Sequence, residues 1–341
     1  MRISNLFALL LVVILFACEG TVSEIDASLN AENNTEVDAD SWAISVANLT
    51  GSDNPFPYAA MPAMSPVTEV EGLNDDDQVI LVSFKTEIKA YPLKFIAPFE
   101  VVNDELEGVH FGISYCPVTE TTLCTENKNG NEPLSLVASG YRQLQNIIVK
   151  DINSNSYWTQ MLIRYVKGPY VNQSPKTLPM IETSWSIVKA YFPDAVVFTS
   201  NSISSKAANS KRKSGDFGID ERIYGVLNES DVTGVSVSII GFDSYDNTIK
   251  VYNQIIGSNN IVVFGSRKYN FITAFETEIS DSYTPVQNKF PIIMKDAAGS
   301  EYNVFGIAVN GPNAGKNLTA PRSYLASWWA WQEFYSNFNE F

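Results

Sequence analysis

The chain contains 341 residues, of which 45% are hydrophobic and 12% aromatic, so it is long and apolar enough to bury a sizeable core. Its formal net charge of −15 disfavours long-range attraction to nucleic acid or to an anionic membrane surface, and no nucleic-acid partner is expected. A single histidine, His110, restricts every histidine-dependent mechanism to one position.

The N-terminus has the features of a lipoprotein signal peptide. Arg2 precedes an apolar run over residues 6–16, which is short for a permanent membrane span. The run ends in Leu15-Phe16-Ala17-Cys18, which resembles the lipobox at which bacterial signal peptides are cut and the cysteine is acylated. We therefore predict a signal peptide over residues 1–17 and an exported protein, anchored to a bacterial membrane through Cys18. An ordinary signal peptide with an unrelated cysteine is the alternative.

Two polar segments separate the predicted folded regions from each other and from the anchor. Residues 18–41 carry seven acidic side chains and no basic ones, which predicts a disordered, self-repelling tether. Packing is expected to start at Trp42. Residues 200–218 are rich in Ser, Asn and Ala around Lys211-Arg212-Lys213, a composition typical of a solvated linker.

Periodicity in the rest of the chain mostly indicates strands. Residues 79–84 and 88–91 flank a polar turn and predict a hairpin. Residues 109–115 alternate apolar with smaller or polar side chains, as in a half-buried strand. Residues 183–192 predict a short helix that stops at a Pro-Asp pair. Further strands are expected at residues 134–138, 147–150 and 157–160.

An internal repeat is indicated by three features that share an offset of 143 residues. Gly168-Pro169, Trp185 and Tyr191-Phe192 recur as Gly311-Pro312, Trp328 and Phe334-Tyr335. We therefore predict two related halves, residues 42–199 and 219–341, joined by the linker. Each half is expected to have strands first and a short aromatic helix last, an α+β fold dominated by antiparallel sheet.

Several short motifs, taken in order, resemble the prokaryotic domain of unknown function 3179 family. They are Lys89-Ala-Tyr-Pro-Leu93, Val102-Asn-Asp104, Tyr115-Cys-Pro-Val-Thr119, Ser139-Gly140, Ser156-Tyr-Trp-Thr-Gln160, Gly168-Pro169 and Ser327-Trp-Trp-Ala-Trp331. The resemblance covers most of the chain beyond Pro55. It implies no particular activity, because none is established for the family. Glu120 stands where glycine is usual, and Phe99 or its neighbours replace a histidine found in many members.

The cysteines allow three interpretations. If Cys116 and Cys124 lie opposite each other on hairpin strands, their Cα atoms would be about 4.5 to 5.5 Å apart, which is within disulfide range. Pairing is the simplest expectation in an oxidising compartment. Two unpaired structural thiols are the first alternative. A reactive Cys116 is the second, and it requires a nearby cation, which Arg142 could supply across strands.

Spacing along one strand excludes other mechanisms. His110 and Cys116 share a face of the predicted strand but lie six residues apart, about 20 Å. That separation excludes a Cys-His dyad and a zinc site built on both residues. The carboxylates of Glu100, Asp104 and Glu105 are expected to be solvated. No Gly-rich phosphate loop or Ser-based catalytic motif stands out, so we predict no cofactor and no metal site.

Three hypotheses for function follow. The first is a tethered domain without catalysis that binds a small ligand or an envelope protein in a cleft between the halves. The second is a thiol-dependent enzyme or redox protein using Cys116, the only catalytic candidate. The third is metal carriage by Cys116, Cys124 and a carboxylate. The second half has Gly265-Ser266 near the place of Tyr115-Cys116, so a site is expected in the first half. The candidate binding residues are Tyr115, Cys116, Thr119, Thr121, Tyr141, Arg142, Trp158 and Gln160.

Overall fold

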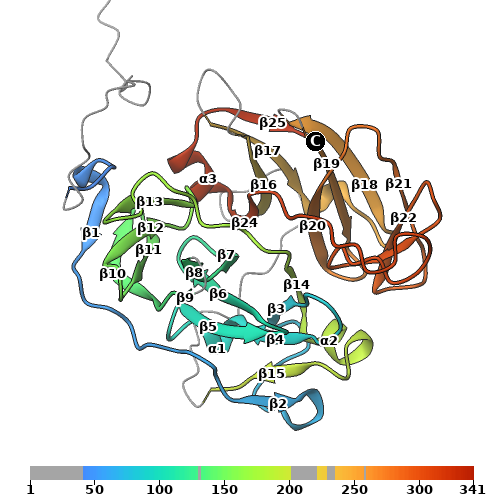
Figure 1. Cartoon of the computed structure of the whole chain (residues 1–341), viewed down its shortest axis with the longest axis horizontal. Helices are drawn as coiled ribbons and strands as arrows, with labels where there is room; N and C mark the ends of the chain where they lie inside the picture. The colour runs from blue at the N-terminus through green and yellow to red at the C-terminus, as the bar shows by residue number, and fades with distance from the viewer. Residues whose placement is uncertain (1–40, 130–131, 201–220, 229–234, 257–258) are drawn as a thin grey trace, which may run out of the picture. The chain divides into compact units, whose positions relative to one another are not determined.

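The computed structural model describes residues 41–129, 132–200, 221–228, 235–256 and 259–341 (Figure 1). The predicted signal peptide, the lipidation site at Cys18, the tether up to residue 40 and most of the linker lie outside the described residues. Residues 37–341 belong to one compact unit. Within the described ranges, no helix has the length and apolar composition needed to cross a membrane.

The predicted fold class is confirmed, because the chain is 47% strand and 10% helix and its strand pairs are mostly antiparallel. A central sheet in the first half has the order β14-β3-β4-β15-β2 and contains the predicted hairpin. Its strands are β2 (Met64–Pro66), β3 (Gln78–Val82), β4 (Lys89–Pro92), β14 (Ile181–Ser184) and β15 (Val196–Phe198), with helices α1 (Leu93–Ile96) and α2 (Trp185–Tyr191).

The second half contains a central sheet with the order β24-β16-β17-β25. Its elements are β16 (Arg222–Asn228), β17 (Ser236–Gly241), β24 (Ser323–Ser327), α3 (Trp328–Phe334) and β25 (Phe338–Glu340). In the first half, β14 pairs antiparallel with hairpin strand β3 and leads into the aromatic helix α2, after which β15 pairs parallel with hairpin strand β4. In the second half, β24 pairs antiparallel with β16 and leads into α3, after which β25 pairs parallel with β17. The halves therefore end in a strand, not in the helix that the sequence predicts.

Three-stranded meanders follow each central hairpin. They are β5 (Val101–Leu106), β6 (Val109–Cys116) and β7 (Thr121–Glu126) in the first half, and β18 (Lys250–Ile256), β19 (Asn259–Ser266) and β20 (Phe271–Thr277) in the second. Outer sheets complete the fold. The outer sheet of the first half comprises β1 (Leu49–Gly51), β10 (Leu136–Gln143), β11 (Asn146–Asp151), β12 (Ser156–Thr159) and β13 (Arg164–Lys167). The outer sheet of the second half comprises β21 (Tyr283–Pro285), β22 (Ile292–Asp296) and β23 (Glu301–Asn303). Strands β8 (Lys128–Asn129) and β9 (Glu132–Pro133) form a small ladder.

The recurring Gly-Pro motif has a local structural cause. Gly168 and Gly311 have φ angles of +88° and +81°, which glycine adopts without strain. A Cβ atom would lie 2.7 Å from the Cα of Ser156 at the first position and 2.5 Å from the Cα of Ser300 at the second. The two halves thus share this close approach as well as their connectivity, and the internal duplication itself stays a prediction.

Alternating faces of the strands build four hydrophobic clusters among the described residues. Val79 and Leu81 of β3 pack in one cluster, and Ile80 and Val82 pack in another. The cluster around Ile80 draws on the first half only, and its counterpart around Tyr224 draws on the second half only. The remaining two clusters contain residues of both halves.

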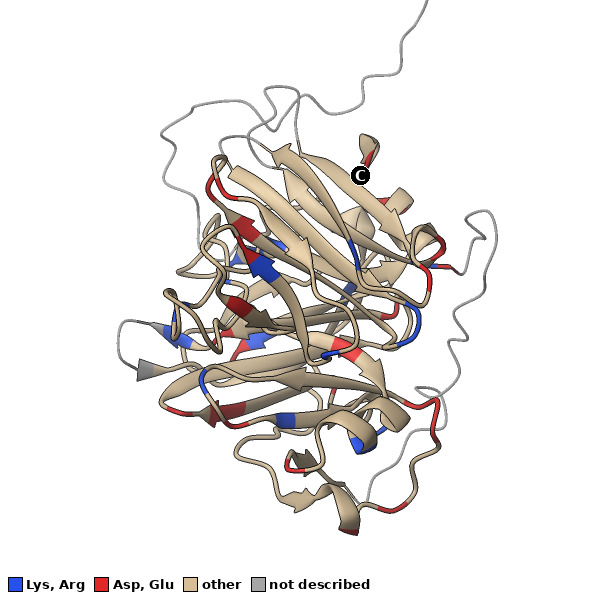
Figure 2. Cartoon of the chain, turned by 90° about the vertical axis from the view of Figure 1, so that its right-hand side faces the viewer, with Lys and Arg blue, Asp and Glu red and all other residues tan. Residues whose placement is uncertain are grey.

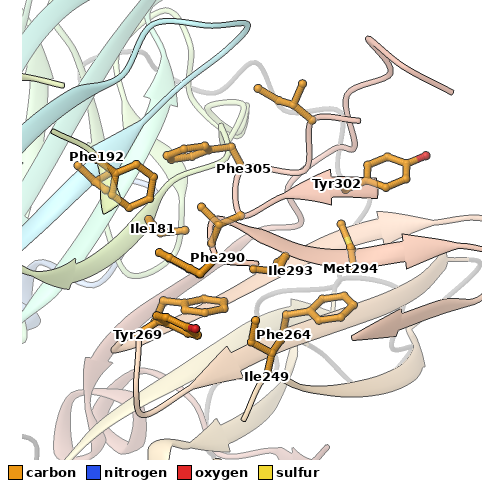
Figure 3. Close-up of a cluster of buried hydrophobic side chains, with 14 of the residues drawn as sticks. Ile181, Phe192, Ile249, Phe264, Tyr269, Phe290, Ile293, Met294, Tyr302 and Phe305 are labelled. Carbon is orange, nitrogen blue, oxygen red and sulfur yellow. The ribbon is translucent and has the colours of Figure 1, made fainter. Parts of the chain in front are cut away.

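These two shared clusters interlock the halves. In one of them the first central sheet packs against β18–β20 and β21–β23, and Figure 3 shows Ile181 and Phe192 among Phe290, Phe305 and other second-half side chains. In the other, β16, β17, β24 and α3 pack against β5–β7 and β10–β13 of the first half. One face of each central sheet is therefore covered by its own half, and the other face is covered by the opposite half together with the sheet's own helix, α2 or α3.

Candidate functional site

The β6–β7 hairpin determines where the two described cysteines point. Its register pairs Cys116 with Thr121 and Ile113 with Cys124 across a four-residue turn. Side chains alternate between the faces of a strand, so the two sulfurs lie on opposite faces of the meander. Both cysteines are unpaired, and the predicted disulfide is wrong. The turn begins directly after Cys116, which leaves Cys124 three residues too far along β7 to oppose it.

The two thiols consequently have different environments. Cys116 belongs to the shared cluster with β10 and β11, whereas Cys124 belongs to the cluster confined to the first half. Burial raises the pKa of the Cys124 thiol well above its ordinary range, so this thiol stays protonated and inert. With the sulfurs on opposite faces, a metal site that uses both cysteines has no geometric support.

Arg142 of β10 brings a cation to Cys116. Its Nη1 lies 3.5 Å from the Cys116 sulfur, and its Nη2 donates to Glu100 Oε1 at 2.6 Å. The backbone oxygen of Gln145 lies 3.7 Å from the same sulfur. Cys116 is fully buried, but the Arg142 side chain keeps 22% of its surface exposed. The guanidinium therefore stands between the thiol and solvent.

The charges at this site are coupled. Burial on its own would lower the pKa of Arg142, but Glu100 and Cys116 raise it above its ordinary value. Burial raises the pKa of Glu100, and the ion pair with Arg142 offsets only part of that increase. Arg142 is thus held as a permanent cation between the carboxyl group of Glu100 and the sulfur of Cys116.

Strained backbone surrounds the thiol. Glu100, Glu120, Leu144 and Gln145 all have positive φ angles, between 46° and 71°, although none of them is glycine. Glu100 supplies the carboxylate to Arg142, Glu120 ends the turn after Cys116, and the other two form the β10–β11 turn that faces the sulfur. Such residues cost roughly 1 kcal/mol or more each and concentrate at functional sites.

A buried polar network supports the hairpin from the same side. Asn146 Nδ2 donates to Thr119 Oγ1 at 2.8 Å and to Gln160 Oε1 at 2.9 Å. Gln160 Nε2 donates in turn to Ser114 Oγ at 2.9 Å, and the hydroxyls of Thr119 and Thr121 lie 2.9 Å apart. The predicted residues Thr119, Thr121 and Gln160 are therefore brought together, as fully buried supports of the turn.

The other candidates are dispersed. Tyr115 points into the opposite cluster from Cys116, and Trp158 is buried in the shared core. Tyr141 packs against the ring of Trp42 with centroids 5.2 Å apart. Trp158 and Gln160 are fully buried, whereas Tyr141 and Arg142 are partly exposed, and Arg142 is the one of these four with a hydrogen bond to Cys116 among the described contacts.

Sequence reasoning missed Glu100 and Asn146. Glu100 was expected to be solvated with its acidic neighbours, yet its side chain is 4% exposed. Its position depends on β5 pairing with the end of β6, where Tyr115 N donates to Glu100 O. Asn146 follows the strained turn that faces Cys116. Neither residue is part of a recognisable sequence motif, so the sequence alone does not identify them as site residues.

The second half also holds the turn after Cys116. Arg222, at the start of β16, forms a fully buried ion pair with Glu182 of β14. Its Nε and Nη2 donate to the backbone oxygen of Glu120 at 3.1 and 2.8 Å. Burial on its own would lower the pKa of Arg222, but Glu182 raises it. This contact between halves fixes the turn that positions Cys116.

A separate groove lies where the halves meet. It has a volume of about 310 Å³. Its floor is apolar and its rim carries charges of both signs. Residues of the first half in its lining include Phe84, Lys85, Val109, Glu126, Lys176 and Leu178, and those of the second half include Phe305, Ile307, Asn317 and Leu318.

Comparison with known proteins places the chain in a family. A family model described as "Protein of unknown function (DUF3179)" matches residues 53–338. The chain belongs to the DUF3179 family. The matched region of this DUF3179 protein contains Cys116, Arg142, Glu100 and the groove. No curated protein and no solved structure matches the chain.

The cysteine geometry of the DUF3179 protein leads to a first prediction. In denaturant without a reducing agent, both Cys116 and Cys124 should be alkylated by iodoacetamide, because no disulfide protects them. In the native protein Cys124 should stay unlabelled, because its thiol is buried and protonated. Peptide mass spectrometry measures the modification at each site. Alkylation in denaturant that requires prior reduction would contradict the geometry.

Proposed function

We propose that Cys116 is a redox-active thiol of an exported DUF3179 protein. The observation that carries this proposal is the Arg142 guanidinium 3.5 Å from the Cys116 sulfur. Reactive cysteines are found beside cations, and a guanidinium at this distance can bind negative charge that develops on the sulfur as it reacts.

The surroundings favour oxidation of the thiol over acyl transfer. Acyl transfer by a thiolate needs a general acid or base at the leaving group, and histidine usually supplies it. The only histidine, His110, lies at the far end of β6 beside Glu105. The buried sulfur is also shielded from a large substrate by Arg142. A small oxidant needs neither a nearby histidine nor a wide cleft.

The proposed reaction is reduction of a hydroperoxide. The Cys116 thiolate attacks the terminal oxygen, a sulfur–oxygen bond forms, and the oxygen–oxygen bond breaks. The leaving alkoxide or hydroxide takes up a proton from water, so the peroxide is reduced and Cys116 becomes a sulfenic acid. Two equivalents of an external thiol then restore the cysteine, releasing water and a disulfide. Arg142 binds the anionic oxygen as it develops.

Replacement of Arg142 tests this proposal. We expect Arg142→Ala to slow the loss of the Cys116 thiol in hydrogen peroxide about tenfold, because loss of about 1.4 kcal/mol of transition-state stabilisation by the guanidinium changes the rate by that factor. After peroxide is removed with catalase, free thiols are alkylated in urea and the Cys116 peptide is quantified. Arg142→Lys should retain part of the rate, because it keeps a positive charge.

Arg164→Ala is the matched control, because Arg164 is exposed and donates to Asn172 away from the thiol. It should leave the oxidation rate unchanged. Equal rates in the parent protein, Arg142→Ala and Arg164→Ala would remove the basis of the proposal. Circular dichroism spectra of the three proteins establish that each is folded.

A second candidate function is ligand binding in the groove between the halves, which was expected if two halves form a cleft. Its volume of about 310 Å³ lies at the lower end of the range for small-molecule sites. The apolar floor and the lysines at the rim fit an anionic amphipathic ligand. Acidic and basic residues are interspersed along the ribbon in Figure 2, so rim charges act locally.

The groove can be tested with the anionic dye 1-anilinonaphthalene-8-sulfonate. We expect Lys176→Glu to weaken dye binding about fivefold, since an exposed charge interaction contributes about 1 kcal/mol. Lys128→Glu is the control, because Lys128 pairs with the same Glu126 but lies outside the groove lining. Fluorescence titration gives both affinities. Equal affinities for the two variants would exclude binding in the groove.

We also propose that the chain is exported and lipid-anchored at Cys18, which would place Cys116 where oxidants are present. The apolar run before Cys18 and the lipobox-like residues support this location. Cys18→Ala should move the protein from the membrane fraction to the soluble fraction of cells. An unchanged distribution, measured by immunoblot, would contradict anchoring at this residue.

A further inference from the structure

The segment before the first central sheet runs along an edge of the outer sheet that carries Arg142. Residues 42–56, named here the N-terminal strap, include β1, which pairs antiparallel with β10. Beyond β1, Asn54 N donates to Ser139 O and Phe56 N donates to Ala138 O. The strap thus extends the sheet by main-chain hydrogen bonds over most of the length of β10 (Figure 1).

The strap is attached to the protein surface by few side chains. None of its residues is buried, and Val46 keeps 66% of its surface exposed. Its main side-chain attachment is Trp42, whose ring contacts Tyr141 and Tyr157 with centroids 5.2 and 5.4 Å apart. Segments with little buried apolar surface open locally at a much lower free energy than the core. Asp53 also pairs with Lys150, and Phe56 at the end of the strap packs against a shared cluster. Detachment of residues 42–55 would therefore expose little of the buried core.

The strap is directly connected to the thiol site. Thr50 is the cross-strand partner of Arg142, so their side chains share a face of the sheet. Leu144 N donates to Asn48 O, which holds the strained turn of Leu144 and Gln145. Gln145 O is the backbone atom next to the Cys116 sulfur. Loss of the strap removes a bond that keeps this turn closed over the thiol.

We propose that the N-terminal strap is a detachable cover that controls access to Cys116. When it is in place, the β10–β11 turn and Arg142 close over the sulfur. When it detaches, the turn relaxes from its positive φ angles and the thiol becomes accessible. The inference rests on the proposed redox function and adds a regulatory element to it.

Two substitutions detach the strap without altering the thiol site. A Cβ atom at Gly51 would lie 2.2 Å from Gly140 O, so Gly51→Ala forces β1 away from β10. Trp42→Ala removes the aromatic anchor. Gly315→Ala is the matched control, because its φ of +87° resembles the +83° of Gly51 but a Cβ atom there meets nothing within 4 Å.

The readout is the rate at which methyl methanethiosulfonate modifies Cys116 in the folded full chain. In this reaction the thiolate displaces methanesulfinate and gains a methylthio group, and peptide mass spectrometry after an acid quench resolves Cys116 from the other cysteines. We expect Gly51→Ala and Trp42→Ala to raise the rate about tenfold, in proportion to the opened population. Gly315→Ala should leave the rate unchanged.

The outcomes separate this inference from the proposed function. If Gly51→Ala and Trp42→Ala react at the parent rate while their circular dichroism spectra are unchanged, the strap is not a cover. Equal acceleration by Gly315→Ala would assign the effect to general loosening and would also overturn the inference. The proposed function fails independently, if peroxide oxidation of Cys116 does not depend on Arg142.

Discussion

The two central sheets each have a second apolar face that needs the opposite half of the chain, together with one short helix of its own half, to cover it. Val79 and Leu81 of β3 pack against second-half strands, and Ile223 and Leu227 of β16 pack against first-half strands. Apolar faces left in water would cost about 25 cal/mol for each Å². The halves therefore form one interlocked body, in which neither central sheet has a complete core without the other half.

This interlocking explains where the thiol site lies. The shared cluster that contains β16, β24 and α3 also contains Cys116 and the strands β10 and β11. The ion pair of Arg222 with Glu182 crosses between the halves at the same place and reaches the turn after Cys116. A fully buried pair of this kind is a weak source of stability but a strong geometric constraint. It holds the β6–β7 turn in one position.

The same region contains a conflict between local preference and final structure. Leu144 and Gln145 form a turn with positive φ angles that asparagine and glycine adopt more readily. Glu100 has a positive φ angle and a buried carboxyl, yet both features serve one contact, the ion pair with Arg142. These unfavourable backbone angles and the buried carboxyl all lie around the contact between Arg142 and Cys116. This is the physical reason for proposing a functional role for Cys116 and a structural role for Cys124.

The sequence by itself determined several strands of the first half, the hairpin predicted at residues 79–84 and 88–91, and the aromatic helices, because side-chain periodicity reports which face of an element is apolar. It also determined that His110 and Cys116 are far apart, since both lie on one strand. The tertiary structure alone decided which cysteine faces Arg142 and why no disulfide forms. Register across a turn and the meeting of β6 with the β10–β11 turn depend on packing between segments distant in the chain, and no local pattern encodes that packing.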